Sequence, residues 1–183
     1  MRSVTEKNLS LIDIDILIQE ILRANRQEIN FIYLISPWLS DYPLTNSLIE
    51  YTSNIIDIGD LNYFSDLLCF YKQNGGNLRI ICRPIADNEF NYKKSFIINR
   101  KRLLQKLKIC GAEIKQKSNL HAKVSISSIA VLQGSFNLTP SGRFFNLEYG
   151  SFCTKKENET FYNETLKWSE DLFKNSEMLE IID

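Results

Sequence analysis

The chain has 183 residues, of which 44% are hydrophobic, so it is long enough to bury one well-packed core and short for two. Its 22 basic and 22 acidic residues cancel, which excludes an overall positive charge as the basis for binding a polyanion. Asp13, Asp15 and Glu20 interrupt the N-terminal apolar run, which therefore lacks the unbroken hydrophobic stretch of a signal peptide or membrane span. We expect a single domain over residues 1–183 in a cytoplasmic protein.

The cysteine and histidine content argues against a metal site. Zinc sites are built from closely spaced cysteines and histidines. The chain has one histidine and no Cys-x-x-Cys pair among its four cysteines, Cys69, Cys82, Cys110 and Cys153. We expect no metal, no cofactor and, in a cytoplasmic setting, reduced thiols.

The first half of the chain predicts alternating helices and strands. Apolar residues recur at near-helical spacing from Leu9 to Ile21, and the apolar run at 31–35 suits a buried strand. A helix is predicted from about 60 to 73, because Asn-Gly-Gly follows as a stop signal. The run NLRIICRP after it predicts a second buried strand.

The second half continues this pattern and then becomes richer in strands. The basic stretch 95–109 is predicted to be helical, and AEIKQK follows as a short strand. Further strands are predicted to begin near Leu120, Ala130 and Phe144. A closing amphipathic helix offers four residues to the core: Phe161, Leu166, Trp168 and Leu172. The fold class we expect is an α/β sandwich, with helices on both faces of a mixed β-sheet.

The single histidine, His121, lies two residues before Lys123 in the predicted strand NLHAKVSIS. Side chains alternate along a strand, so His121 and Lys123 would share one face with Ser125 and Ser127. An amphipathic strand with its polar face in water accounts for the same pattern. The alternative is an imidazole and an ammonium group placed together for chemistry.

More polar groups follow on the next predicted strands. A tight serine turn returns AVLQGS beside the first strand and brings Ser135 and Asn137 toward the histidine. Gly134 allows the backbone a close approach, although a bulge glycine with a turn asparagine explains the same letters. Glu148 lies among aromatic and apolar residues, where a carboxylate needs a partner.

Together these residues resemble the half-site of the phospholipase D superfamily. That half-site reads His-x-Lys, then Gly-Ser-x-Asn and a downstream glutamate, here His121-Ala122-Lys123, Gly134-Ser135-Phe136-Asn137 and Glu148. This chain departs from the family at Ser128, where the family has an aspartate that is mainly structural. The resemblance implies a phospholipase D-like sandwich with one module per chain.

The resemblance also implies a role for each residue. His121 attacks phosphorus to give a covalent phosphohistidine, which splits phosphodiester cleavage into two easier steps. Lys123 and Asn137 hold the nonbridging oxygens, and Ser135 adds a hydroxyl. Glu148 accepts a hydrogen bond from the far nitrogen of a histidine ring. This chemistry requires no metal and no cofactor.

A single His-x-Lys motif leaves half of the chemistry unassigned. The leaving alkoxide needs a proton, and a second histidine is the expected donor. A homodimer whose two-fold axis passes through the site supplies that histidine. Single-motif members resemble small bacterial endonucleases, so we expect a nuclease that cleaves DNA or RNA at a composite site.

A basic segment adjoins the motif. Residues 93–117 contain nine basic residues and one acidic residue, which suits a nucleic-acid backbone, although a solvated helix face explains such a run as well. Trp38, Phe90 and Tyr92 are candidates for stacking on unpaired bases. The substrate-binding residues we expect are Lys93, Lys94, Arg100, Lys101, Arg102 and Trp38.

The loop SPWLSD resembles one in relatives that accompany helicases and modification enzymes in phage-defence clusters. Besides a second copy and nucleic acid, we therefore expect partners of the defence or DNA-modification type, and no membrane. Two other functions stay open. A nucleic-acid-binding or assembly subunit without turnover is suggested by Ser128 and by the zero net charge. A phosphatidyl hydrolase or transferase is disfavoured because no amphipathic membrane-surface stretch stands out.

Overall fold

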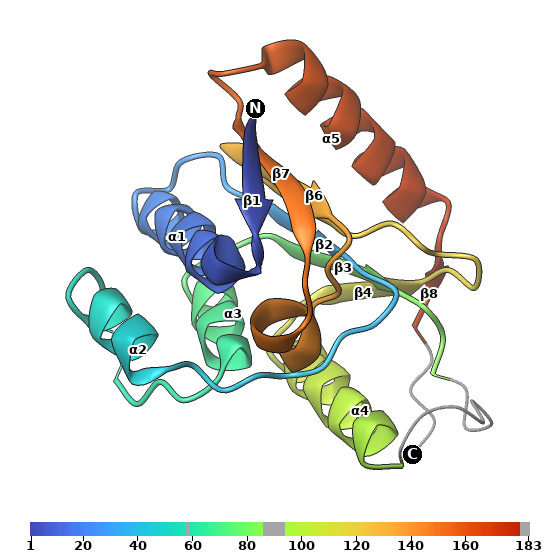
Figure 1. Ribbon diagram of the computed structural model, residues 1–183, viewed down its shortest axis with the longest axis horizontal. Helices are drawn as coiled ribbons and strands as arrows, with labels where there is room; N and C mark the ends of the chain where they lie inside the picture. The colour runs from blue at the N-terminus through green and yellow to red at the C-terminus, as the bar shows by residue number, and fades with distance from the viewer. Residues whose placement is uncertain (58, 86–93, 180–183) are drawn as a thin grey trace.

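A single mixed sheet organises the molecule (Figure 1). The structure is a computed structural model that describes residues 1–57, 59–85 and 94–179. Within these residues eight strands pair in the order β1-β7-β6-β5-β2-β3-β4-β8, and β2, β3 and β4 run parallel while the other pairs are antiparallel. The strands are β1 (Arg2–Thr5), β2 (Ile32–Ile35), β3 (Leu78–Cys82), β4 (Glu113–Gln116), β5 (Val124–Ser127), β6 (Ala130–Gly134), β7 (Tyr149–Thr154) and β8 (Glu177–Met178).

Helices cover both faces of the sheet, which confirms the predicted fold class (Figure 1). One face carries α1 (Glu6–Asn25), α2 (Asn46–Ser53), α3 (Phe64–Gln73) and α4 (Lys94–Ile109), and α5 (Glu159–Lys174) packs against the other. No helix in the described part of the chain is both long enough and apolar enough to span a bilayer.

The central strands are apolar throughout because both of their faces are covered. In β2, Leu34 packs into the core beneath α1 and α3, whereas Tyr33 and Ile35 belong to the core beneath α5. In β3, Ile80 and Ile81 divide in the same way. Alternate side chains of each strand therefore point into two separate hydrophobic cores, as expected for a sheet between layers of helices.

Two predictions from the second half of the chain are wrong. The strand predicted near Phe144 is a π-helix, η1 (Ser141–Phe145), and β7 begins only at Tyr149. The helix packs closely: a Cβ on Gly142 would lie 2.4 Å from the backbone oxygen of Asn137. Trp168 is 42% exposed and does not join the core; Tyr162 and Phe173 fill the corresponding space beneath α5.

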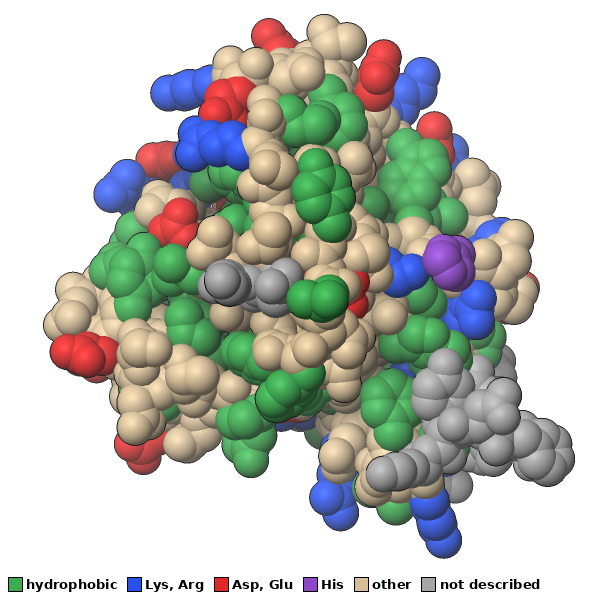
Figure 2. All heavy atoms as spheres, viewed as in Figure 1, with side chains coloured by type: hydrophobic (Ala, Val, Ile, Leu, Met, Phe, Trp, Pro, Cys, Tyr) green, Lys and Arg blue, Asp and Glu red, His purple; other side chains and the backbone are tan. Residues whose placement is uncertain are grey.

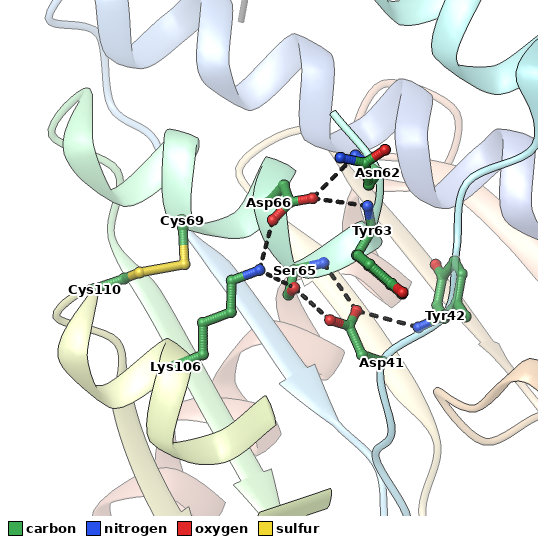
Figure 3. Close-up of polar contacts among 9 residues, drawn as sticks. All are labelled: Asp41, Tyr42, Asn62, Tyr63, Ser65, Asp66, Cys69, Lys106 and Cys110. Atoms are coloured by element: carbon green, nitrogen blue, oxygen red, sulfur yellow. Dashed lines mark hydrogen bonds and ion pairs between the residues drawn. A yellow bond between two sulfur atoms is a disulfide. The ribbon is translucent and has the colours of Figure 1, made fainter. Parts of the chain in front are cut away.

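The expectation that all cysteines are reduced is also wrong, because Cys69 and Cys110 form a disulfide (Figure 3). The bond joins α3 to the residue that follows α4. These cysteines are 41 residues apart, and such a spacing carries no information about pairing. The same two helices are joined by Lys106, which binds Asp66 at 2.5 Å and the Ser65 hydroxyl at 2.6 Å.

Candidate active site

The half-site residues converge on one edge of the sheet. His121 and Lys123 precede β5, Ser135 and Asn137 follow β6, and Glu148 precedes β7. The carboxyl ends of β2 and β3 lie at the same edge, since Ile35 at the end of β2 pairs with Val124 at the start of β5. The edge where parallel strands end is a common place for a ligand site.

The histidine and the lysine are held together through the backbone. The Lys123 ammonium group donates a hydrogen bond to the carbonyl oxygen of His121 at 2.7 Å. The imidazole is exposed, and it is visible on the face of the molecule shown in Figure 2. Both residues lie before the strand and not in it. Ser125 and Ser127, in the strand itself, are buried, so a water-facing polar strand is the wrong interpretation of this segment.

The side chains of Ser135 and Glu148 are hydrogen-bonded to each other. The Ser135 hydroxyl donates to the Glu148 carboxylate, whose other oxygen accepts from the Asn146 side chain at 3.2 Å. The Tyr149 amide donates to the Ser135 hydroxyl at 3.2 Å, and the Ser135 amide donates to the Tyr149 carbonyl at 3.0 Å. Glu148 thus has the partner that the sequence required, and Ser135 is fixed by three hydrogen bonds, two at its hydroxyl and one at its amide.

Gly134 makes the close backbone approach that the sequence suggested. It pairs with Gly150 of β7, and a Cβ at Gly134 would lie 2.5 Å from the Tyr149 carbonyl oxygen and 2.4 Å from the Phe136 ring. The ring of Phe136 also lies against Gly150, and the Arg143 guanidinium lies 4.7 Å from the centre of that ring. Side chains at either glycine would push this aromatic ring out of its place.

A buried ion pair anchors η1 beneath the site. Arg143 binds Asp13 of α1 at 2.6 Å, and both side chains are almost fully buried. Burial raises the pKa of Asp13 to about 6, against the opposing effect of Arg143. The aspartate that interrupts the N-terminal apolar run therefore pairs with the segment that connects Asn137 to Glu148.

Leu138, the neighbour of Asn137 in the chain, is held by the loop that follows β2. The Ser36 hydroxyl accepts from the Leu138 amide at 3.2 Å, and the Ser40 amide donates to the Leu138 carbonyl at 2.9 Å. The SPWLSD loop thus lies against the residues that follow β6. The side-chain oxygen of Asn137 is buried and has no hydrogen-bond partner among the described residues. A buried acceptor in that state carries a desolvation penalty.

Arg83 is a site residue that the sequence analysis missed. Partial burial lowers the pKa of Lys123, and the Arg83 charge lowers it further, against the opposing Glu148 carboxylate. Arg83 follows β3, donates to the Leu120 carbonyl at 2.8 Å and lies over the Trp38 ring at 5.4 Å. Its place directly after a buried parallel strand is a signal that would have found it.

The predicted basic surface is only partly at the surface. Lys94 and Arg102 are exposed and Lys101 is half-buried, whereas Lys93, Phe90 and Tyr92 lie outside the described residues. Arg100 is 2% exposed and donates to the backbone carbonyl of Arg83, so its assignment to a substrate-binding surface is wrong. Its guanidinium lies 5.2 Å from the Trp38 ring centre and supports that ring.

The departure at position 128 has a structural counterpart. The Ser128 hydroxyl donates to the Glu20 carboxylate of α1 at 2.6 Å, and the Phe31 amide donates to the other Glu20 oxygen at 3.2 Å. Glu20 is fully buried, and burial raises its pKa. A carboxylate from α1 therefore holds the β5–β6 turn, where the family has its own aspartate.

The architecture matches solved structures. The crystal structure of a phospholipase D family member, Nuc from Salmonella typhimurium, superposes with a TM-score of 0.55 at 16% identity over 87% of this chain and 88% of that one. This chain has the phospholipase D fold. NucT from Helicobacter pylori also superposes on this chain, with a TM-score of 0.54 at 10% identity. The match covers 97% of this chain and 99% of the NucT chain.

A larger protein contains a region of similar architecture. TrmBL2, described as an archaeal chromatin protein with a novel mode of DNA binding, matches at a TM-score of 0.55 and 12% identity over 98% of this chain and 55% of its own. No protein-family model and no curated protein sequence matches this chain. The phospholipase D fold is therefore preserved here at a level of identity where sequence comparison finds nothing.

Proposed function

We propose that the protein is a phosphodiesterase that cleaves nucleic acid through a phosphohistidine intermediate. The observation that carries this proposal is the exposed His121, whose backbone carbonyl accepts a hydrogen bond from the Lys123 ammonium group. Arg83 and Glu148 lie close to that ammonium group, and Glu148 is hydrogen-bonded to Ser135. A neutral imidazole is a nucleophile, and the Lys123 and Arg83 cations favour the negative charge that builds on a phosphoryl group in the transition state.

The reaction proceeds in two displacements. The imidazole nitrogen attacks phosphorus, so a P–N bond forms and the P–O bond to the leaving group breaks as a second imidazole gives that oxygen a proton. Water then attacks phosphorus, the P–N bond breaks, and the second imidazole takes the proton from the water. The chain has one histidine, so the second imidazole belongs to another copy.

An apolar patch beside the site supports pairing of two copies. Phe145, Leu147 and Tyr149 are 79%, 93% and 67% exposed, and they flank Glu148 in the sequence. Large apolar side chains gathered at the surface are typical of interaction sites. Because a two-fold axis brings the same patch of both copies together, contact here sets the two half-sites face to face.

Leu147→Asp is expected to weaken the dimer at least tenfold and to lower activity in parallel, because like charges meet across a two-fold axis. Leu147 is almost fully exposed, so the fold should be unaffected. Ile109→Asp is the matched control, since Ile109 is 86% exposed at the end of α4. Sedimentation equilibrium and cleavage rates measure both effects. An active monomeric Leu147→Asp protein would contradict the shared site.

Nucleic acid is the substrate that the surroundings favour. Lys94 and Arg102 on α4 are exposed, and Arg83 and Lys123 lie at the site itself. Clustered cations bind a phosphate backbone and make its binding depend on salt. The second candidate function is binding of nucleic acid without turnover, which the likeness to the chromatin protein TrmBL2 favours.

Cleavage of a labelled oligonucleotide in excess EDTA is the experiment that tests the proposal. We expect full activity, because the nucleophile is an imidazole and protein cations meet the phosphate charge. The control is a metal-dependent nuclease in the same buffer, which must stop. Retained binding without cleavage, under all conditions, would support the second candidate, and strict dependence on magnesium would contradict the mechanism.

A further inference from the structure

A cavity of about 600 Å³ opens beside the half-site and shares Asn137 with it. Trp38 follows β2, Phe96 and Asn99 lie on α4, and Asn146 follows η1. A volume of this size is typical of a pocket for a small molecule or for one unit of a polymer. Asn146, which also binds Glu148, is a second link between the cavity and the half-site.

The lining offers uncharged hydrogen-bonding groups and aromatic rings. Trp38 and Phe96 meet edge to face with their centres 6.4 Å apart. Arg83 and Arg100 both lie over the Trp38 ring, at 5.4 Å and 5.2 Å, which holds that ring in place. The polar part of the lining consists of amide and hydroxyl groups, including those of Asn99, Asn137, Ser141 and Asn146.

The single carboxylate in the lining, among the described residues, is already engaged (Figure 3). Asp41 faces the start of α3, where one oxygen accepts from the amides of Tyr42 and Ser65, each at 3.1 Å. Its other oxygen accepts from the Ser65 hydroxyl at 2.5 Å. The described lining contains no lysine or arginine, so it offers no cationic side chain to bind an anionic group.

The cavity lining thus combines uncharged amide and hydroxyl groups with the aromatic rings of Trp38 and Phe96. A nucleobase meets these conditions, since its edge carries both N–H donors and acceptors and its faces stack on aromatic rings. A lone phosphate supplies neither an N–H group nor an aromatic face. The cavity adjoins the residues proposed to hold the scissile phosphate, so the base belongs to a nucleotide next to the cleaved bond.

The geometry points to a subsite that binds one unpaired nucleobase next to the scissile phosphate. This inference rests on the proposed function and sharpens it, because a base inside the cavity cannot remain stacked in a duplex. The substrate is therefore single-stranded nucleic acid or a duplex with an extruded nucleotide.

Binding to two oligonucleotides tests the subsite without relying on cleavage. The His121→Ala protein, which leaves the probe intact, is titrated with a fluorescein-labelled oligothymidylate and with an abasic strand of the same length. We expect the base-containing strand to bind about tenfold tighter, the scale of one stacked base. Asn99→Ala and Phe96→Ala in the same background should reduce this ratio at least threefold.

Arg102→Ala is the matched control, because Arg102 is exposed on α4 and lies outside the described lining. It removes a charge from both complexes, so the ratio of the two affinities should stay constant. Equal affinities for both strands, or an unchanged ratio in Asn99→Ala and Phe96→Ala, would overturn the subsite and leave the nuclease proposal standing. Binding of neither strand would overturn both, and thermal melting verifies that each variant is folded.

Discussion

His121→Ala is expected to lower the cleavage rate about a thousandfold or more, because it removes the nucleophile of one copy and the acid of the other. The side chain is exposed, so the melting temperature should change little. Single-turnover cleavage of a labelled oligonucleotide measures the loss. Near-normal cleavage by this variant would refute the phosphohistidine mechanism.

Mixing the variant with wild-type protein tests the shared site itself. If each dimer has one composite site that needs both rings, a mixed dimer is inactive, and activity follows the square of the wild-type fraction. About a quarter of the starting activity should remain at equal mixing after full exchange. Mass spectrometry on size-tagged chains verifies the exchange. A linear response, with about half of the activity left, would show that each copy works alone.

Lys123→Ala is expected to lower turnover about a hundredfold or more, since it removes a cation aimed at the charge that develops in the transition state. Lys123 binds the backbone of His121 and lies close to Glu148 and Arg83. Lys108→Ala is the control, because it removes the same charge from an exposed position near the end of α4.

The fall should appear in kcat more than in KM, because the interaction strengthens as negative charge builds on the phosphoryl oxygens. Lys123→Arg keeps the charge and should retain part of the activity. Equal losses for Lys123→Ala and Lys108→Ala would indicate a general effect of charge and would count against a specific role.

The fold was predictable where the local pattern and the final environment agree. The apolar runs at 31–35 and 78–82 became central strands because both of their faces are covered. The π-helix at 141–145 was not predictable, because it depends on the contact of Gly142 with the backbone of Asn137. The disulfide between Cys69 and Cys110 depends in the same way on the packing of α3 against α4.

The residues of the candidate motif were predictable from the sequence, whereas the exposure and the contacts of the residues around it were less so. The sequence motif identified His121 and Ser135, which the structure places at one edge of the sheet. Arg100 shows the limit of reasoning from charge, since it lies in a basic run yet is buried with backbone carbonyls as its partners. The Trp38 ring packs against Arg83 and Arg100, which are far away in the sequence, so no local pattern reveals these contacts.

The bond between Ser128 and Glu20 makes the two positions a coupled pair for evolution and for protein engineering. Restoring the family's aspartate at position 128 alone sets two carboxylates against each other around a fully buried Glu20. The consensus residue is thus compatible with this scaffold only after position 20 has become neutral. A motif search that scores position 128 alone registers a missing aspartate, whereas the carboxyl group beside this turn is supplied by Glu20 of α1.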